Sequence, residues 1–175
     1  ENIGIIVAGI GLTILFKAYD KSLLAAVTLT AVLYHTLNHA FFKSLLFLAT
    51  GSVLHATKER SLGKLGGLIH RMPWVAWLAL VGTLAIAGLP PLNGFVSEWL
   101  LLQAFLFTPT LPQSFVNMLV PLATAALVLA VALAAYVMVK FYAIVFLGRM
   151  REPHLAYAND AGLLERAALI YLAAG

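Results

Sequence analysis

Long apolar runs constrain this chain more than any other feature, because they divide nearly all of it into segments suited to a lipid bilayer. Apolar residues make up 62% of its 175 residues and charged residues only 10%. Soluble proteins are roughly 45–50% apolar and about 25% charged. A transmembrane helix needs about 20 mostly apolar residues. The composition therefore excludes an ordinary soluble domain and predicts an all-α, polytopic transmembrane helix bundle.

Five apolar segments, separated by short charged or Pro/Gly-containing stretches, define the expected helices of a single transmembrane domain. They cover residues 2–16, 22–56, 73–107, 115–147 and 161–175. Pro121 lies early in the fourth segment and suits a first helical turn. The chain begins at Glu1 rather than Met and stops within an apolar run. We therefore expect it to be an internal piece of a larger protein.

The third apolar segment is interrupted near its middle, at residues 89–94. Pro90 and Pro91 remove two N–H donors and force the preceding residues out of helical geometry, and Asn93 and Gly94 follow them. Each flank has about 14 residues, too few to span a bilayer alone. We expect one crossing by a helix that is broken at mid-depth, in protein or beside a wet cavity. A re-entrant hairpin of two half-helices is the alternative.

The loop charges indicate an orientation in the membrane. If each segment crosses once, the loops 57–72 and 148–160 fall on the same side. Their basic residues are Lys58, Arg60, Lys64, Arg71, Arg149 and Arg151. Loops rich in Lys and Arg face the cytoplasm. We therefore expect both loops to be cytoplasmic, in a bacterial or archaeal inner membrane. We expect the net charge of +4 to interact with the membrane surface rather than with nucleic acid.

A ladder of ionisable residues, His35, His39 and Lys43, lies within the second segment. Residues four apart on a helix differ by about 40° in azimuth and about 6 Å in height, so the three form one slowly drifting stripe. Asn38 lies at its edge. Histidine titrates near neutrality, and steps of this size suit proton transfer through a bridging water. The stripe predicts a proton relay.

Simpler roles exist for the members of this stripe. A single membrane histidine can hydrogen-bond a neighbouring carbonyl, and a lysine near the end of a span can extend to the interface. Zinc needs three or four ligands, and His55, the next histidine, is about 18 Å further along the helix. Placing a charge at mid-membrane costs about 2.5–3.5 kcal/mol, so keeping several together favours the relay over these alternatives.

Glu98 and Lys140 are two further ionisable residues inside apolar segments. Glu98 follows the break directly, where desolvation favours its neutral form while the following half-helix and nearby cations favour its charged form. It is therefore a candidate proton site. Its structural alternative is a fixed ion pair with Lys43 or Lys140. Lys140 itself either extends to the interface or lines an exit path.

Three stretches of the sequence resemble the antiporter-like subunits of respiratory complex I and of related membrane-bound hydrogenases. They are Tyr34 to Val53, which contains the stripe; Leu62 to Pro73, with its Gly-Lys-Leu-Gly-Gly turn; and Gly88 to Glu98, with the double proline. Within this family the motifs are most similar to the large membrane subunit of formate hydrogenlyase-type hydrogenases. The resemblance covers nearly the whole chain.

This resemblance implies a fourteen-helix fold with two inverted five-helix repeats, of which the chain would be most of the second repeat and the start of the last helix. His35, His39 and Lys43 would form the central relay, and Glu98 the terminal site beside the broken helix. Redox chemistry would belong to partner subunits. With 0 Cys the chain has no cysteine-held cluster, and we expect no cofactor of its own.

We therefore interpret the chain as a proton-translocating membrane subunit of a redox-driven complex, of the NADH-quinone oxidoreductase or formate hydrogenlyase type. Its partners would be other membrane subunits and, through them, a redox arm. The first alternative is a subunit of a multisubunit sodium/proton antiporter. The second is a membrane scaffold whose charges form static pairs.

Overall fold

The computed structural model describes residues 1–175 and contains α-helices, short 3-10 helices and no strands. The α-helices are α1 (Asn2–Ala18), α2 (Ser22–Thr57), α3 (Pro73–Ile86), α4 (Asn93–Leu106), α5 (Ser114–Phe146) and α6 (Leu163–Ala174). The 3-10 helices are η1 (Leu62–Lys64), η2 (Leu68–His70) and η3 (Pro153–Tyr157). The prediction of an all-α bundle with one broken helix is confirmed, since α3 and α4 together occupy the third apolar segment.

Two helices, α2 and α5, are long and apolar enough to cross a membrane, with 36 and 33 residues. The side chains of α5 are largely exposed and apolar, as at Leu129, Leu133 and Val137. Such a surface suits contact with lipid or with other membrane helices. By contrast, α3 and α4 have 14 residues each, about 21 Å of helix, which is too short to span.

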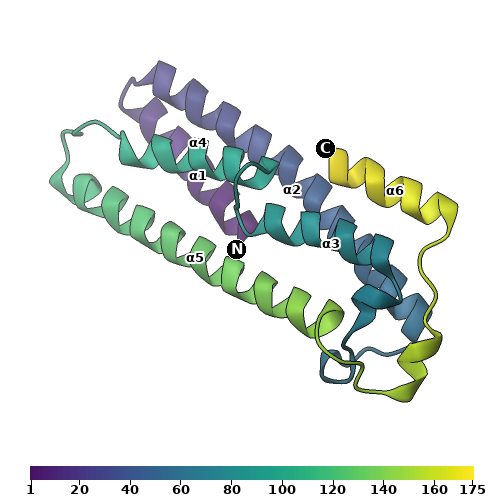
Figure 1. Cartoon of the computed structure of the whole chain (residues 1–175). Coiled ribbons are helices and arrows are strands. Elements are labelled where there is room, and N and C mark those ends of the chain that lie inside the picture. The colour runs from purple at the N-terminus through teal and green to yellow at the C-terminus, as the bar shows by residue number, and fades with distance from the viewer.

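The two half-helices follow one another along α2, as Figure 1 shows. Ala49 of α2 belongs to the same packed cluster as Ala76 of α3. Nearer the start of α2, Val32 shares a cluster with Leu101 of α4. The half-helices therefore run antiparallel to α2, from one end of the bundle to the other. A hairpin would instead return α4 to the end where α3 begins.

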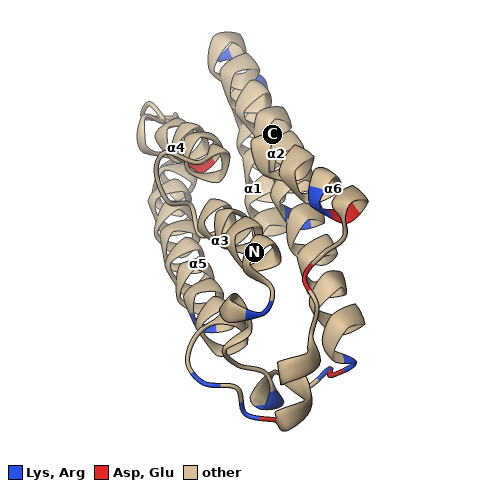
Figure 2. Cartoon of the chain, turned by 45° about the vertical axis from the view of Figure 1, so that its right-hand side comes forward, with Lys and Arg blue, Asp and Glu red and all other residues tan.

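Apart from the break between α3 and α4, the connections between the α-helices lie at the two ends of the bundle. At one end the backbone N–H of Gly67 donates to the carbonyl of Leu147 at 2.9 Å, and the Arg151 guanidinium donates to the carbonyl of Leu62 at 3.3 Å. At the other end the Tyr19 hydroxyl donates to the side chain of Gln113 at 3.0 Å. The two basic loops thus lie side by side, and Figure 2 shows charged residues collected at that end.

The break between the half-helices begins at Gly88, which takes the left-handed conformation with φ 63°. The N–H of Gly88 donates to the carbonyl of Ala85, and that of Leu89 donates to the carbonyl of Leu84, both at 3.1 Å. This pair of bonds is the Schellman motif, which satisfies the last carbonyls of a helix. The following residues, Pro90 and Pro91, then prevent the helix from continuing.

The second half-helix begins earlier than the sequence suggests. Asn93 and Gly94, expected in the break, form the first turn of α4. The Asn93 side-chain oxygen accepts the N–H of Gly94 at 2.8 Å and so satisfies one free donor of that turn. Gly94 also packs directly on the backbone of Ala85, where a Cβ would overlap the carbonyl oxygen. Only glycine allows the two half-helices to approach this closely.

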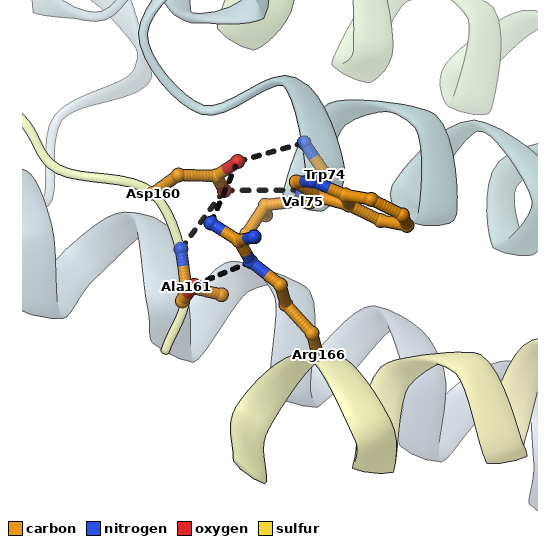
Figure 3. Close-up of polar contacts among 5 residues, drawn as sticks. All are labelled: Trp74, Val75, Asp160, Ala161 and Arg166. Carbon is orange, nitrogen blue, oxygen red and sulfur yellow. Dashed lines mark hydrogen bonds and ion pairs between the residues drawn. The ribbon is translucent and has the colours of Figure 1, made fainter. Parts of the chain in front are cut away.

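The start of α3 is capped by a residue from a distant loop, as Figure 3 shows. The Asp160 carboxylate accepts the backbone N–H of Trp74 at 2.9 Å and that of Val75 at 3.3 Å. Arg166 of α6 pairs with the same carboxylate at 3.8 Å and lies over the Trp74 ring. A helix cap of this kind contributes about 0.5–2 kcal/mol. The cap fixes α3 and the start of α6 to one another.

Candidate functional site

His35 is the polar centre of the interface between α2 and α4. Its side chain is fully buried, and its Nδ1 lies 2.9 Å from the hydroxyl oxygen of Ser97, which is also fully buried. Its Nε2 is buried and has no hydrogen-bond partner in the protein. Ser97 lies in the second turn of α4, immediately before Glu98. The first member of the predicted stripe therefore contacts the broken helix directly.

Asn38 makes a second polar link between α2 and the broken helix. Its side-chain amide donates to the backbone carbonyl of Asn93 at 2.9 Å. Residues three apart share a helix face, so Asn38 lies beside His35 toward α4. The sequence places Asn38 at the edge of the stripe, and the structure brings it to the first turn after the break.

The remaining members of the stripe turn away from α4. His39 is half-buried, with its ring edge against Phe42 at a centroid distance of 5.4 Å. Lys43 is exposed, and its Nζ lies 5.7 Å from the centre of the Phe47 ring. It shares a shallow hollow with Met138 and Phe141 of α5. The drift of about 40° per step carries the stripe from the α4 interface to the side that faces α5.

Glu98 lies on the side of α4 that faces α5, in a cavity whose walls include Leu127 and Val128. Its Oε1 is buried without a hydrogen-bond partner. Its Oε2 rests against Gly88, where an added Cβ would overlap the carboxylate. Gly88 also lines this cavity, which has a volume of about 180 Å³ and mainly apolar walls. The carboxyl group therefore sits at the break in an apolar setting.

No ion pair involves the candidate site residues, which are His35, His39, Lys43, Glu98 and Lys140. The two ion pairs of the chain, Lys64–Glu59 at 3.6 Å and Arg166–Asp160 at 3.8 Å, both lie at the basic end. Glu98 pairs with neither Lys43 nor Lys140. Lys140 is exposed on α5 and lines neither the Glu98 cavity nor the hollow beside Lys43. The fixed pair considered from the sequence does not form in this structure.

Two residues at the site were not singled out from the sequence. Ser97 has no distinctive spacing, because its role depends on a contact with His35, 62 residues earlier in the chain. Gly88 had an available signal, since a glycine followed shortly by prolines is typical of a helix C-terminus. The space that Gly88 leaves for Glu98 appears only in three dimensions.

This arrangement suits proton transfer more than metal binding. An imidazole, a hydroxyl and a carboxyl group lie around one helix break, and groups of these kinds pass protons directly or through one water. No group of three or more His, Cys, Asp or Glu side chains in the chain is placed to hold a metal ion.

Comparison with known proteins identifies the family. The family model described as "NADH:quinone oxidoreductase/Mrp antiporter, TM" matches residues 21–120, more than half of the chain. The chain belongs to this family. The resemblance seen in the sequence motifs is thereby confirmed, and both the stripe and the broken helix lie within the matched part of this antiporter-family chain.

Similar proteins are subunits of membrane complexes. The chain is 41% identical over 173 residues to formate hydrogenlyase subunit 3 of Escherichia coli K12 and 37% identical over 174 residues to hydrogenase-4 component B of the same strain. It is 39% identical over 98 residues to one subunit of the Na(+)/H(+) antiporter of Bacillus subtilis 168. That match covers 56% of this chain and 12% of the antiporter subunit. The first two matches cover 99% of this chain but 28% and 26% of those proteins. The chain thus spans about a quarter of their length.

Solved structures share the fold of this antiporter-family chain. The structure of the membrane-bound sulfane sulfur reductase, an archaeal respiratory membrane complex, matches with a TM-score of 0.71 and 27% identity, over 99% of this chain and 30% of that one. The Mrp complex from Dietzia sp. DQ12-45-1b matches with a TM-score of 0.67 and 23% identity, over 87% and 35%. The second match supports the fold alone.

Proposed function

We propose that this chain carries part of a proton path through a membrane subunit of a redox-driven complex, of the NADH-quinone oxidoreductase or hydrogenase type. The main support is the buried His35, which is hydrogen-bonded to the broken helix through Ser97. Glu98, the next residue on that helix, has a buried carboxylate oxygen without a partner. The extent of the match to formate hydrogenlyase subunit 3 supports the type of complex.

In this proposal each ionisable residue has a separate task. Glu98 gains and loses its proton without breaking an ion pair, because it has none. His35 exchanges protons with the row of His39 and Lys43 by way of water. Positive charges on neighbouring members of the row repel each other, so a proton on one disfavours a proton on the next. We leave Lys140 outside the path, because it is exposed on α5 and shares no cavity with the others.

The proposed partners are the other membrane subunits of the complex and, through them, a redox arm that supplies the driving force. The relatives are subunits of formate hydrogenlyase and hydrogenase-4 by name. The chain would form most of a second antiporter-like repeat, in a bacterial or archaeal inner membrane. The lipid-facing surface would include the exposed apolar side chains of α5.

We also propose that the two basic loops, 57–72 and 148–160, face the cytoplasm. Single cysteines at Ser61 and Gln113, introduced into the full-length protein without other accessible thiols, test this in intact cells. A membrane-impermeant maleimide should label Gln113→Cys and leave Ser61→Cys unlabelled until the cells are permeabilised. The opposite pattern would reverse the orientation, and labelling of both positions from outside would contradict the single crossing of α3 and α4.

A sodium/proton antiporter is the second candidate, favoured by the match over 98 residues to the antiporter protein of Bacillus subtilis. Both candidates use the same polar residues, so mutation of those residues does not separate them. The purified full-length complex does. Proton uptake that depends on an electron donor and not on sodium supports the redox-driven complex, whereas sodium-dependent exchange without electron transfer supports the antiporter.

The role of Glu98 is tested by changing its ability to titrate. In full-length protein reconstituted in liposomes with its complex, Glu98→Gln should reduce proton uptake at least about 100-fold, within the range of one acid–base group. Glu98→Asp should keep part of the activity, because it still titrates. Glu152→Gln, in the basic loop, is the control and should transport normally. Wild-type uptake in Glu98→Gln would favour the scaffold alternative.

A further inference from the structure

The Ser97 hydroxyl is placed between one nitrogen and two carbonyl groups. Its oxygen lies 2.9 Å from His35 Nδ1, 3.1 Å from the carbonyl oxygen of Asn93 and 3.1 Å from that of Gly94. Carbonyl oxygens only accept hydrogen bonds, and a hydroxyl has one hydrogen to donate. When Ser97 donates to either carbonyl, its oxygen must therefore accept its third contact from an N–H at His35 Nδ1.

The two neutral forms of His35 differ in how many bonds they complete. With the hydrogen on Nδ1, His35 donates to Ser97 and Ser97 donates to a carbonyl of α4. With the hydrogen on Nε2, Ser97 must donate to Nδ1 and loses its carbonyl bond. The buried Nε2–H would also remain without a protein partner. Buried N–H donors are seldom left unpaired, so the geometry favours the Nδ1–H form.

We propose that Ser97 is a positioning residue that holds His35 in the Nδ1–H tautomer and thereby makes Nε2 the atom that accepts and releases protons. Protonation at Nε2 leaves the Nδ1–H bond to Ser97 intact, and so does deprotonation. Proton exchange thus proceeds without breaking the contact between α2 and α4. The consequence for transport rests on the proposed function, whereas the tautomer itself does not.

The tautomer can be measured directly in the full-length protein within its membrane complex. Nitrogen NMR of ¹⁵N-histidine-labelled protein distinguishes a protonated from an unprotonated ring nitrogen, and the difference from His35→Gln assigns the signals. The spectra are recorded at a pH where His35 is neutral. Wild type and Ser44→Ala, an exposed control on α2, should both show Nδ1–H. Ser97→Ala should show the Nε2–H form or a mixture.

Proton uptake of the same samples gives a second readout. Ser97→Ala should transport about 10-fold more slowly, as expected when an orienting partner is lost, and Ser97→Thr, which keeps a hydroxyl, should restore the Nδ1–H form and most of the rate. An Nε2–H signal assigned to His35 in wild type would overturn the proposal, and that result does not depend on the folding of Ser97→Ala. An unchanged tautomer in Ser97→Ala would also overturn it. A changed tautomer with normal uptake would support the positioning role and count against His35 as a relay member.

Discussion

Gly88 meets two requirements at once in this protein. Its φ of 63° closes the Schellman motif that ends α3. Its missing side chain leaves room for the Glu98 carboxylate, which rests against it. The residue that ends α3 therefore also leaves room for the Glu98 carboxylate. This coupling links the backbone geometry of the break to the chemistry of the candidate site.

Gly88→Ala should consequently damage both stability and transport. An L-residue in the left-handed conformation costs about 1–2 kcal/mol, and the added Cβ must displace the Glu98 carboxylate. Gly51→Ala is the matched control, because Gly51 lies within α2 with no atom near its missing Cβ. That change should stabilise the protein by about 0.5–1 kcal/mol. Thermal unfolding and proton uptake of the full-length variants measure both effects, and equal behaviour of the two variants would contradict this account of Gly88.

At the residue scale, the sequence predicts candidates better than it predicts contacts. His35, His39, Lys43 and Glu98 stand out because ionisable groups are rare in apolar segments. Their partners do not stand out. Ser97 is an ordinary residue until the fold places it 2.9 Å from His35. The separate exposures of His35 and Lys43, at opposite ends of the stripe, also depend on which helices pack around α2.

At the scale of single elements, the positions of the helices follow from the sequence. They are determined by the length of each apolar segment and by the charged residues between the segments. The helices begin and end close to the expected ranges, and the break lies at the double proline. The differences are local. Asn93 and Gly94 join α4 because a side-chain bond and a close backbone approach stabilise its first turn.

Pro121 is a second local difference. The sequence suggested a position in the first helical turn, but α5 begins at Ser114 and continues through the proline. Asn117 helps to stabilise the start of α5 ahead of the proline. Its side chain accepts the N–H of Leu111 at 2.8 Å and donates to the Leu111 carbonyl at 2.7 Å. The preceding loop is thereby fixed to the first turn of the helix, an arrangement that sequence periodicity does not reveal.

At the scale of the whole molecule, the sequence indicates only indirectly which loops lie at the same end of the bundle. The basic charges sort to one side only if the broken helix crosses once. The structure brings the two basic loops into contact, since the Arg151 guanidinium donates to the carbonyl of Leu62. It also adds a cap that the sequence does not indicate, Asp160 on the start of α3, because that contact joins residues 86 positions apart.

From the position of Lys43 in the bundle, we expect that this residue can be changed without loss of the fold. Lys43 is exposed and makes no ion pair, and its Nζ lies 5.7 Å from the centre of the Phe47 ring. Removing its charge would therefore remove a proposed proton-carrying group and little packing. Lys140→Met provides the matched control, because Lys140 is also exposed and lies within an apolar helix.

The most direct test of a proton path along this chain is proton uptake by the full-length Lys43→Met protein, assembled in its complex and reconstituted in liposomes. We expect assembly at the wild-type level and proton uptake reduced at least about 100-fold, as for the loss of one acid–base group. Lys140→Met should assemble and transport normally. Normal uptake in Lys43→Met would contradict the account, because the row of ionisable residues on α2 would then carry no protons.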